Sequence, residues 1–253
     1  MVYFEGMEKM DFNGIPAAAA DKRRPFLEEV LSCCPEKVHS IYVTGSAVTP
    51  DFNEKTSDVN SLIVLNNLHF EFFKFLAPLG KKFKSKGISA PLVMTPSYIK
   101  ESLDVFPMEF LELKLIHKTA YGADIVKDLE IDRGLLRLQC EREIKTRLIG
   151  LWNGYVSSMG ETDMISHLLY RSIKGCMPLF RSIIFLLGKQ PPLKKLDVIG
   201  TINGNTGIDK DVLIKALLLK ESPIKNREEL LSLFERYYGN LETVAGIVNA
   251  LQQ

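Results

Sequence analysis

Residues 43–65 read VTGSAVTPDFNEKTSDVNSLIVL, and this stretch decides the fold. Residues 38–44 (VHSIYVT) predict a strand that ends at Gly45-Ser46, and residues 58–65 (DVNSLIVL) predict a second strand, because both runs are rich in β-branched and aliphatic side chains. A polar loop joins them. Glycine lets the backbone turn tightly and approach a ligand. Amides after such a turn, together with the Ser46 hydroxyl, can hold phosphate oxygens.

The second strand opens with two oxygen-bearing side chains, Asp58 and Asn60. Residues two apart on a strand point the same way, so we expect both on one side, with Val59 turned away. Two such side chains beside a phosphate-holding turn are a candidate Mg²⁺ site. Taken alone, the glycine-serine turn also fits a plain loop, and Asp58 also fits a solvated strand start.

This arrangement resembles the nucleotidyltransferase superfamily, which includes DNA polymerase beta and kanamycin nucleotidyltransferase. The family pattern is a hydrophobic strand, Gly-Ser, a spacer of about ten residues, and then acid-x-acid on the next strand. Gly45, Ser46 and Asp58 match it, whereas Asn60 stands where the family has a second acid. The resemblance covers roughly the first half of the chain. It implies that Gly45 and Ser46 bind nucleotide and that Asp58 and Asn60 bind metal and are catalytic.

The family places a third carboxylate on a later strand, and the segment VFPMEFLEL offers two candidates. If a strand runs through residues 105–109, Glu109 projects beside the Asp58 strand, and we favour it as metal ligand and catalytic residue. Glu112 is the alternative. The two differ by three, so they face opposite ways on a strand and share a face on a helix. Asp104 is a weaker third choice.

The order of elements predicts an α+β protein: a nucleotidyltransferase-like mixed sheet with flanking helices, followed by an all-helical bundle. We expect a loosely ordered segment over residues 1–20, an α/β domain over 21–132 and a helical domain over 133–253. Helical patterns dominate after the boundary near Gly134. We predict the helices and the remaining short strand over these ranges: 25–34, 69–85, 91–94 (strand), 96–103, 135–156, 163–187, 193–199, 210–220 and 226–251.

The resemblance implies a Mg²⁺-dependent transfer of a nucleoside monophosphate from an NTP to a small-molecule or protein acceptor. Compared with the acid that the family has at this position, Asn60 offers a carbonyl oxygen without a negative charge. A second metal ion is therefore harder to hold. The alternative is therefore an impaired or inactive member that binds a nucleotide or a protein, as in toxin–antitoxin systems. In a third reading, the chain is an unrelated interaction protein.

Composition narrows the class of partner. The 253 residues carry 32 Lys and Arg against 31 Asp and Glu, a net charge of +1, which argues against general nucleic-acid binding. The apolar run near residues 183–187 is too short to span a membrane, and there is no signal-peptide pattern. Four cysteines without metal-ligand spacing indicate reduced thiols and a cytoplasmic protein. Neither oligomeric state nor acceptor follows from these patterns.

The helix over residues 135–156 carries several cations, and two interpretations stay open. Arg137, Arg142, Lys145 and Arg147 could face a triphosphate across a cleft. The simpler interpretation is a solvated face with intrahelical pairs to acids such as Glu141. The sequence favours core or interface positions over a base-stacking platform for the aromatic residues of this half, which are Trp152, Tyr155, Tyr237 and Tyr238.

Overall fold

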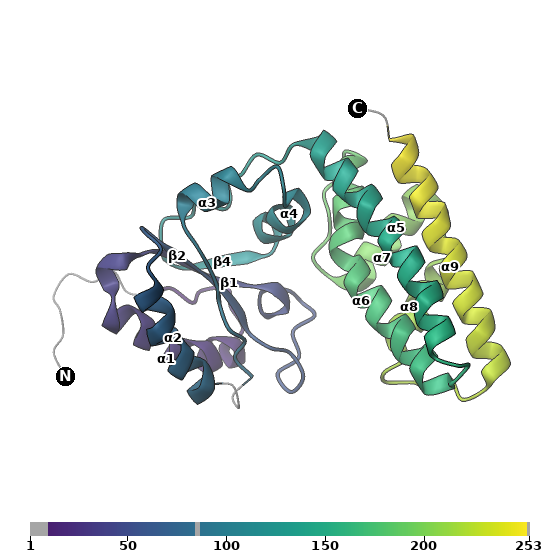
Figure 1. The fold of residues 1–253 in the computed structure, drawn as a ribbon, viewed down its shortest axis with the longest axis horizontal. Helices are drawn as coiled ribbons and strands as arrows, with labels where there is room; N and C mark the ends of the chain where they lie inside the picture. Colours follow the sequence, from purple (N-terminus) through teal and green to yellow (C-terminus); the bar gives the residue numbers. More distant parts are fainter. Residues whose placement is uncertain (1–9, 84–86, 252–253) are drawn as a thin grey trace. The chain divides into compact units, whose positions relative to one another are not determined.

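A mixed sheet in the order β3-β2-β1-β4 organises the first half of the chain (Figure 1). The structure is a computed structural model that describes residues 10–83 and 87–251. Its strands are β1 (Val38–Thr44), β2 (Asn60–Leu65), β3 (Leu92–Met94) and β4 (His117–Gly122). β1 is antiparallel to both β2 and β4, whereas β2 and β3 are parallel. The parallel pair needs a crossover, and α2 (Phe70–Phe83) supplies it.

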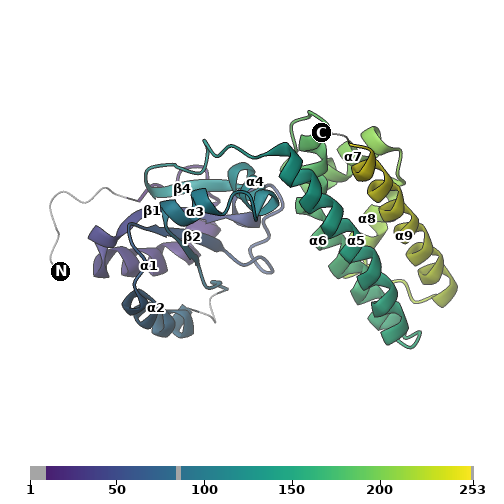
Figure 2. The ribbon, with the colours of Figure 1, turned by 45° about the horizontal axis from the view of Figure 1, so that its top comes forward.

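Two helices cover one face of this sheet, as Figures 1 and 2 show. α1 (Ala17–Cys33) and α2 bury side chains such as Phe26, Leu27 and Phe72 against Ile41 and Ile63 of β1 and β2, in a single apolar cluster. Short 3-10 turns, η1 (Pro35–Lys37) and η2 (Gly45–Val48), bracket β1, and α3 (Pro96–Glu101) follows β3. This packing holds the ends of β1 and β2, and therefore the candidate site, at a fixed place on the sheet.

The N-terminal segment is more ordered than its composition predicts. Phe12 and Ile15 are buried in the same apolar cluster, and the Asp11 amide donates to the Ala120 carbonyl at 2.8 Å. α1 begins at Ala17 rather than at Pro25, because alanines are the best helix formers and the helix buries one face. Of the segment expected to be loose, residues 1–9 lie outside the described residues.

The predicted strand over residues 105–109 is wrong, because α4 (Pro107–Leu115) occupies this segment. Proline is favoured in the first turn of a helix, where its missing N–H costs nothing. The chain instead forms β4, whose polar sequence HKTAYG gives little strand signal. Gly122, at φ +71°, ends β4 where a Cβ would come within 2.2 Å of the His39 carbonyl oxygen, so only glycine fits there.

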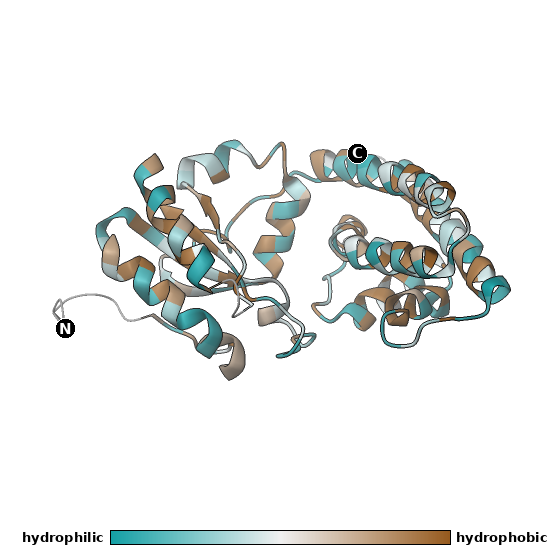
Figure 3. Ribbon diagram, turned by 60° about the horizontal axis from the view of Figure 1, so that its bottom comes forward, coloured by the Kyte–Doolittle hydropathy of each residue, from teal (hydrophilic) through white to brown (hydrophobic). Residues whose placement is uncertain are grey.

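The rest of the described chain is helical, as predicted. The helices are α5 (Arg133–Ser157), α6 (Thr162–Leu186), α7 (Lys195–Thr206), α8 (Lys210–Leu218) and α9 (Arg227–Ala250). They combine apolar and polar residues, as Figure 3 shows, and the apolar faces form the bundle core. Asp132, Asp209 and Asn226 cap α5, α8 and α9 with side-chain hydrogen bonds. α6 continues through Pro178 as one helix.

The chain divides into two compact units. The α/β unit comprises Met1–Leu103 and Leu113–Glu130, and the helical unit comprises Asp104–Glu112 and Ile131–Gln253. The segment 104–112, which lies within the predicted α/β domain, therefore packs with the helical unit. Within the described residues, no helix is both long enough and apolar enough to cross a membrane.

Candidate functional site

The Gly45-Ser46 turn follows β1 directly. Gly45 has a φ of +71°, a left-handed conformation that favours glycine. Thr44 pairs with Asn60 across the β1–β2 ladder, so the turn sits beside the start of β2. A Cβ built on Gly45 would come within 3.1 Å of the Asn60 Nδ2 atom. The structure therefore brings Gly45 and Asn60 together.

Asp58 and Asn60 flank the buried residue Val59. Both are exposed, and Val59 forms a bridge to Ile88. This alternation is the one predicted for a strand. Asp58, however, precedes the ladder and lies in the loop that leads to β2. Its Oδ1 atom is 3.9 Å from the position that a Cβ of Gly87 would take, which places Asp58 beside the segment that enters β3.

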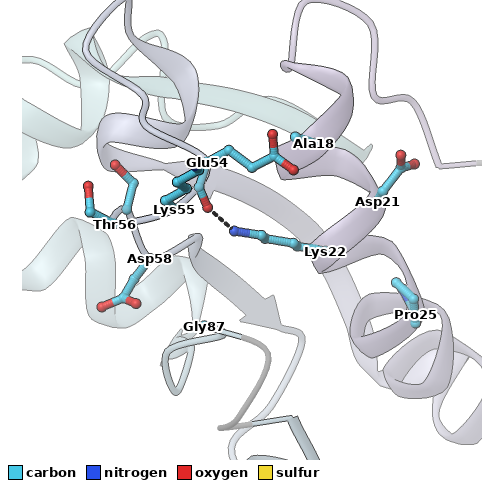
Figure 4. A pocket seen from close by; sticks show the side chains of 10 residues that line it. Ala18, Asp21, Lys22, Pro25, Glu54, Lys55, Thr56, Asp58 and Gly87 are labelled. Atoms are coloured by element: carbon cyan, nitrogen blue, oxygen red, sulfur yellow. Dashed lines mark hydrogen bonds between the residues drawn. The ribbon is translucent and has the colours of Figure 1, made fainter.

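A pocket of about 700 Å³, which we name the Asp58 pocket, opens beside this carboxylate (Figure 4). Lys22 of α1 reaches into it and donates to the Glu54 carbonyl oxygen. Three carboxylates and two ammonium groups are among the groups that line it. Besides Asp58, the lining residues are Ala18, Asp21, Lys22, Pro25, Glu54, Lys55, Thr56, Ser57 and Gly87.

Glu109 and Glu112 lie on α4 and contact the bundle helices. Glu109 Oε2 accepts from Gln139 Nε2 of α5 at 2.7 Å. Glu112 Oε1 accepts from Arg181 of α6 at 2.7 Å. Burial raises the pKa of Glu112, although the Arg181 guanidinium opposes the shift. We expected a strand over residues 105–109 to place Glu109 beside Asp58. Instead, both carboxylates project from a helix and are hydrogen-bonded within the helical unit.

The two outer strands of the sheet, β3 and β4, carry no Asp or Glu. β3 consists of Leu92, Val93 and Met94, and β4 has the sequence HKTAYG. Leu92 pairs with Leu62 of β2 and is 58% exposed. Among the described residues, no group of three or more His, Cys, Asp or Glu side chains could hold a metal ion. Asn60 thus lies at the turn and Asp58 lies beside Gly87, and neither β3 nor β4 contributes a third acid.

The cations of α5 form intrahelical pairs. Arg137 and Lys145 both contact Glu141, at 3.0 Å and 2.5 Å, and Arg147 lies 3.8 Å from Glu143. These contacts agree with the simpler interpretation of α5, which is a solvated helix face with intrahelical pairs. Tyr237 is fully buried, whereas Trp152 is about half exposed. The four cysteines are free, and Cys34, Cys140 and Cys176 are buried.

Sequence reasoning missed Arg23, which is fully buried behind β2. Its guanidinium donates to Ser61 Oγ and, at 2.9 Å, to the Ser89 carbonyl oxygen, while Nε has no partner among the described residues. Burial lowers the pKa of Arg23 to about 9, so the group stays charged at neutral pH. Arg23 occupies a core position of the helical pattern Ala19, Arg23, Phe26, Val30. An arginine at a core position of this pattern could have indicated a buried charged group.

Comparison with known proteins identifies the fold. No protein-family model and no curated protein sequence matches the chain. Among solved structures, spectinomycin adenyltransferase from Enterococcus faecialis, determined with ATP and spectinomycin, superposes with a TM-score of 0.54 at 10% sequence identity. The match covers 88% of this chain and 99% of that chain.

The fold is that of a nucleotidyltransferase. A match over 88% of the chain is longer than either compact unit, so it includes parts of both. The predicted fold class is confirmed, and the resemblance inferred from residues 43–65 is confirmed at the level of the fold. At 10% identity, the superposition establishes the fold but not the reaction, which has to be inferred from the residues of this chain.

Proposed function

We propose that this protein binds a Mg²⁺-nucleotide at the Gly45-Ser46 turn and transfers nucleoside monophosphate slowly or not at all. The observation that carries the proposal is the residue composition near the turn: Asn60 lies beside Gly45, Asp58 precedes Asn60 by two residues, and Leu92 stands on the neighbouring strand. The backbone amides of the turn would hold phosphate oxygens, and the fixed ends of β1 and β2 would orient them.

One Mg²⁺ ion fits this donor set better than two. Asp58 supplies one charge and Asn60 a neutral carbonyl oxygen, and Mg²⁺ commonly takes only one or two protein ligands, with phosphates and water filling the octahedron. A bound ion would neutralise phosphate charge. Two-metal transfer needs a cluster of anionic ligands, and the two main candidates for the third carboxylate, Glu109 and Glu112, are hydrogen-bonded to Gln139 and Arg181.

A second candidate function is active transfer to a small-molecule acceptor. It is favoured by the superposed adenyltransferase, which was determined with ATP and a small acceptor, and by the extent of the match beyond the α/β unit. Under this alternative, the Asn60 carbonyl is an adequate ligand and a substrate phosphate supplies the missing charge. The acceptor would be a hydroxyl-bearing small molecule.

Calorimetric titration of ATP with Mg²⁺ or Mn²⁺ tests the proposal. The wild type should bind weakly, Asp58→Ala should lose metal-dependent binding, and Asn60→Asp should bind about tenfold more tightly, which corresponds to about 1.4 kcal/mol. The matched control is Asp128→Ala, which removes an exposed aspartate elsewhere in the α/β unit. Equal binding by all four proteins would contradict a metal site at Asp58.

Two further measurements separate the alternatives. Pyrophosphate release from ATP in the presence of hydroxylated small molecules, at rates typical of enzymes, would establish the second candidate. Glu109→Gln and Glu112→Gln should leave nucleotide affinity unchanged. A loss of metal-dependent binding in Glu109→Gln would show that this carboxylate completes the site, as the sequence-based expectation held.

A further inference from the structure

The pairing between β2 and the segment that enters β3 is interrupted directly beside Asp58. The Val59–Ile88 bridge stands apart from the regular parallel ladder, which begins further along both segments. Between the bridge and the ladder, one side has the two residues 60–61 and the other has the three residues 89–91. Such irregularities interrupt the ladder hydrogen bonds and can re-aim a side chain. The contacts that hold this break therefore also set the position of Asp58, which directly precedes the bridge.

The guanidinium of Arg23 spans this break. From α1 it donates to Ser61 Oγ on one side and, at 2.9 Å, to the Ser89 carbonyl oxygen on the other. Ser61 lies two residues after Val59, and Ser89 directly follows Ile88, so both acceptors adjoin the bridge. Arg23 thus connects the two segments through its side chain at the point where the strand pairing is interrupted.

The same guanidinium joins the elements that line the Asp58 pocket (Figure 4). α1, which carries Arg23, lines the pocket with four residues, the loop before β2 lines it with residues 54–58, and Gly87 comes from the segment that enters β3. The Val59 amide donates to the Gly87 carbonyl oxygen at 3.2 Å. Asp58 lies between these contacts and the loop, so a shift between the two segments would move its carboxylate relative to the rest of the pocket.

Packing alone does not account for a cation at this position. Arg23 is fully buried, and the two acceptors of its hydrogen bonds are neutral. Its guanidinium lies over the Phe26 ring, 4.4 Å from the centroid, which adds a cation–π contact. Burying a charge is costly, and apolar side chains of similar volume are often as stable in its place. A guanidinium differs from them in its rigid fork of donors, which reaches two acceptors at once.

We propose that Arg23 is a positioning residue, which holds Asp58 in the place where that carboxylate binds the divalent ion. Arg23 acts through the two segments that it joins rather than by contact with the ion. The inference rests on the proposed function for the role of Asp58, and it names the residue on which that role depends. The Gly45-Ser46 turn follows β1, outside the two segments that Arg23 joins, so phosphate contacts at the turn should persist without Arg23.

Titration of ATP with Mg²⁺ and, separately, with EDTA tests this role. Arg23→Met removes both hydrogen bonds and should lower the Mg²⁺-dependent gain in ATP affinity about tenfold, as does the loss of a contact that supports a metal ligand. Its affinity in EDTA should equal that of the wild type. Arg23→Lys, whose compact ammonium lacks the fork, should restore part of the gain. Arg24→Met, which changes the adjacent exposed arginine, is the matched control and should behave like the wild type. An unchanged gain in Arg23→Met, or an equal fall with Mg²⁺ and with EDTA, would overturn the proposal.

Hydrogen exchange at the Val59 amide tests the positioning without nucleotide, and it also covers the case in which Arg23→Met does not fold. The milder Ser61→Ala removes only the acceptor on β2 and should speed exchange of this amide at least about fivefold, because exchange follows local opening. Ser40→Ala, which removes a buried hydroxyl from β1, is the matched control and should leave this amide unchanged. Unchanged exchange in Ser61→Ala would overturn the role of Arg23 while the proposed function stands. Equal Mg²⁺-dependent ATP binding by the wild type and Asp58→Ala would instead contradict the proposed function, and the role of Arg23 with it.

Discussion

At the scale of single residues, the candidate site depends on a glycine conformation and on one amide. Gly45 adopts a φ of +71° beside Asn60, so the turn proposed to hold phosphate lies against the proposed metal ligand. Any side chain at position 45 would press on the Asn60 amide. A change in the turn is therefore also a change in the proposed metal site.

We predict that Gly45→Ala destabilises the protein by about 1–2 kcal/mol and weakens nucleotide binding. The left-handed conformation is unfavourable for alanine, and the new Cβ would lie 3.1 Å from Asn60 Nδ2. Gly200→Ala is the control, since Gly200 lies within α7 with open space around it, and alanine should stabilise that helix by about 0.5–1 kcal/mol. Urea unfolding and ATP titration check both effects. Unchanged affinity in Gly45→Ala would place the nucleotide elsewhere.

At the scale of elements, Gln139 joins α4 to α5. The Gln139 side-chain oxygen accepts from the Met108 amide at 2.8 Å, and its nitrogen donates to Glu109 at 2.7 Å. Gln139 and Met108 are both buried. A buried amide group that bonds both a backbone N–H and a carboxylate fixes the helix it contacts, which explains why residues 104–112 pack with the helical unit.

Replacing this residue should therefore loosen α4. Gln139→Ala would leave the buried Met108 amide without its acceptor, and we expect a loss of about 1–3 kcal/mol in the free energy of unfolding. Asn153→Ala removes an exposed amide from the same helix and should change stability by less than about 0.5 kcal/mol. Guanidinium titration monitored by far-UV circular dichroism compares the two. Equal effects would mean that the Gln139 contacts contribute no net stability.

At the scale of the whole molecule, the helical unit is discontinuous in sequence. Glu112 belongs to it and contacts Arg181, which is buried and also donates to the Pro192 and Leu193 carbonyl oxygens. The chain therefore contributes residues 104–112 to the helical unit before it returns to the α/β unit and completes the sheet with β4. A boundary drawn at residue 132, as the sequence predicts, would separate Glu112 from Arg181.

A comparison of two fragments tests this organisation. A fragment of residues 104–253 should unfold at a temperature at least about 4 °C higher than a fragment of residues 131–253, because the shorter one lacks α4 and leaves Arg181 without its carboxylate. In the longer fragment, Glu112→Gln should remove part of the difference. Equal melting temperatures would show that α4 adds nothing to the stability of the bundle.

The sequence by itself determined the parts of this protein that depend on local pattern. The β1 and β2 strands, the glycine-serine turn between them and the long amphipathic helices follow from residue type and periodicity. The resemblance of residues 43–65 to the nucleotidyltransferase superfamily then predicted the fold. The alternation of Asp58, Val59 and Asn60 also followed, because side-chain direction on a strand is a local property.

Tertiary structure alone decided which distant groups meet. The segment 105–109 was predicted as a strand because its residues suit either state. In the helix that it forms instead, the Met108 amide donates to Gln139 and Glu112 accepts from Arg181. β4 was missed because HKTAYG carries no strong strand pattern and gains its ladder only from β1. The hydrogen bonds of Arg23, Glu109 and Glu112 are made to partners 30 to 69 residues away in the sequence. Such contacts are selected by packing of the whole chain, and no local preference encodes them.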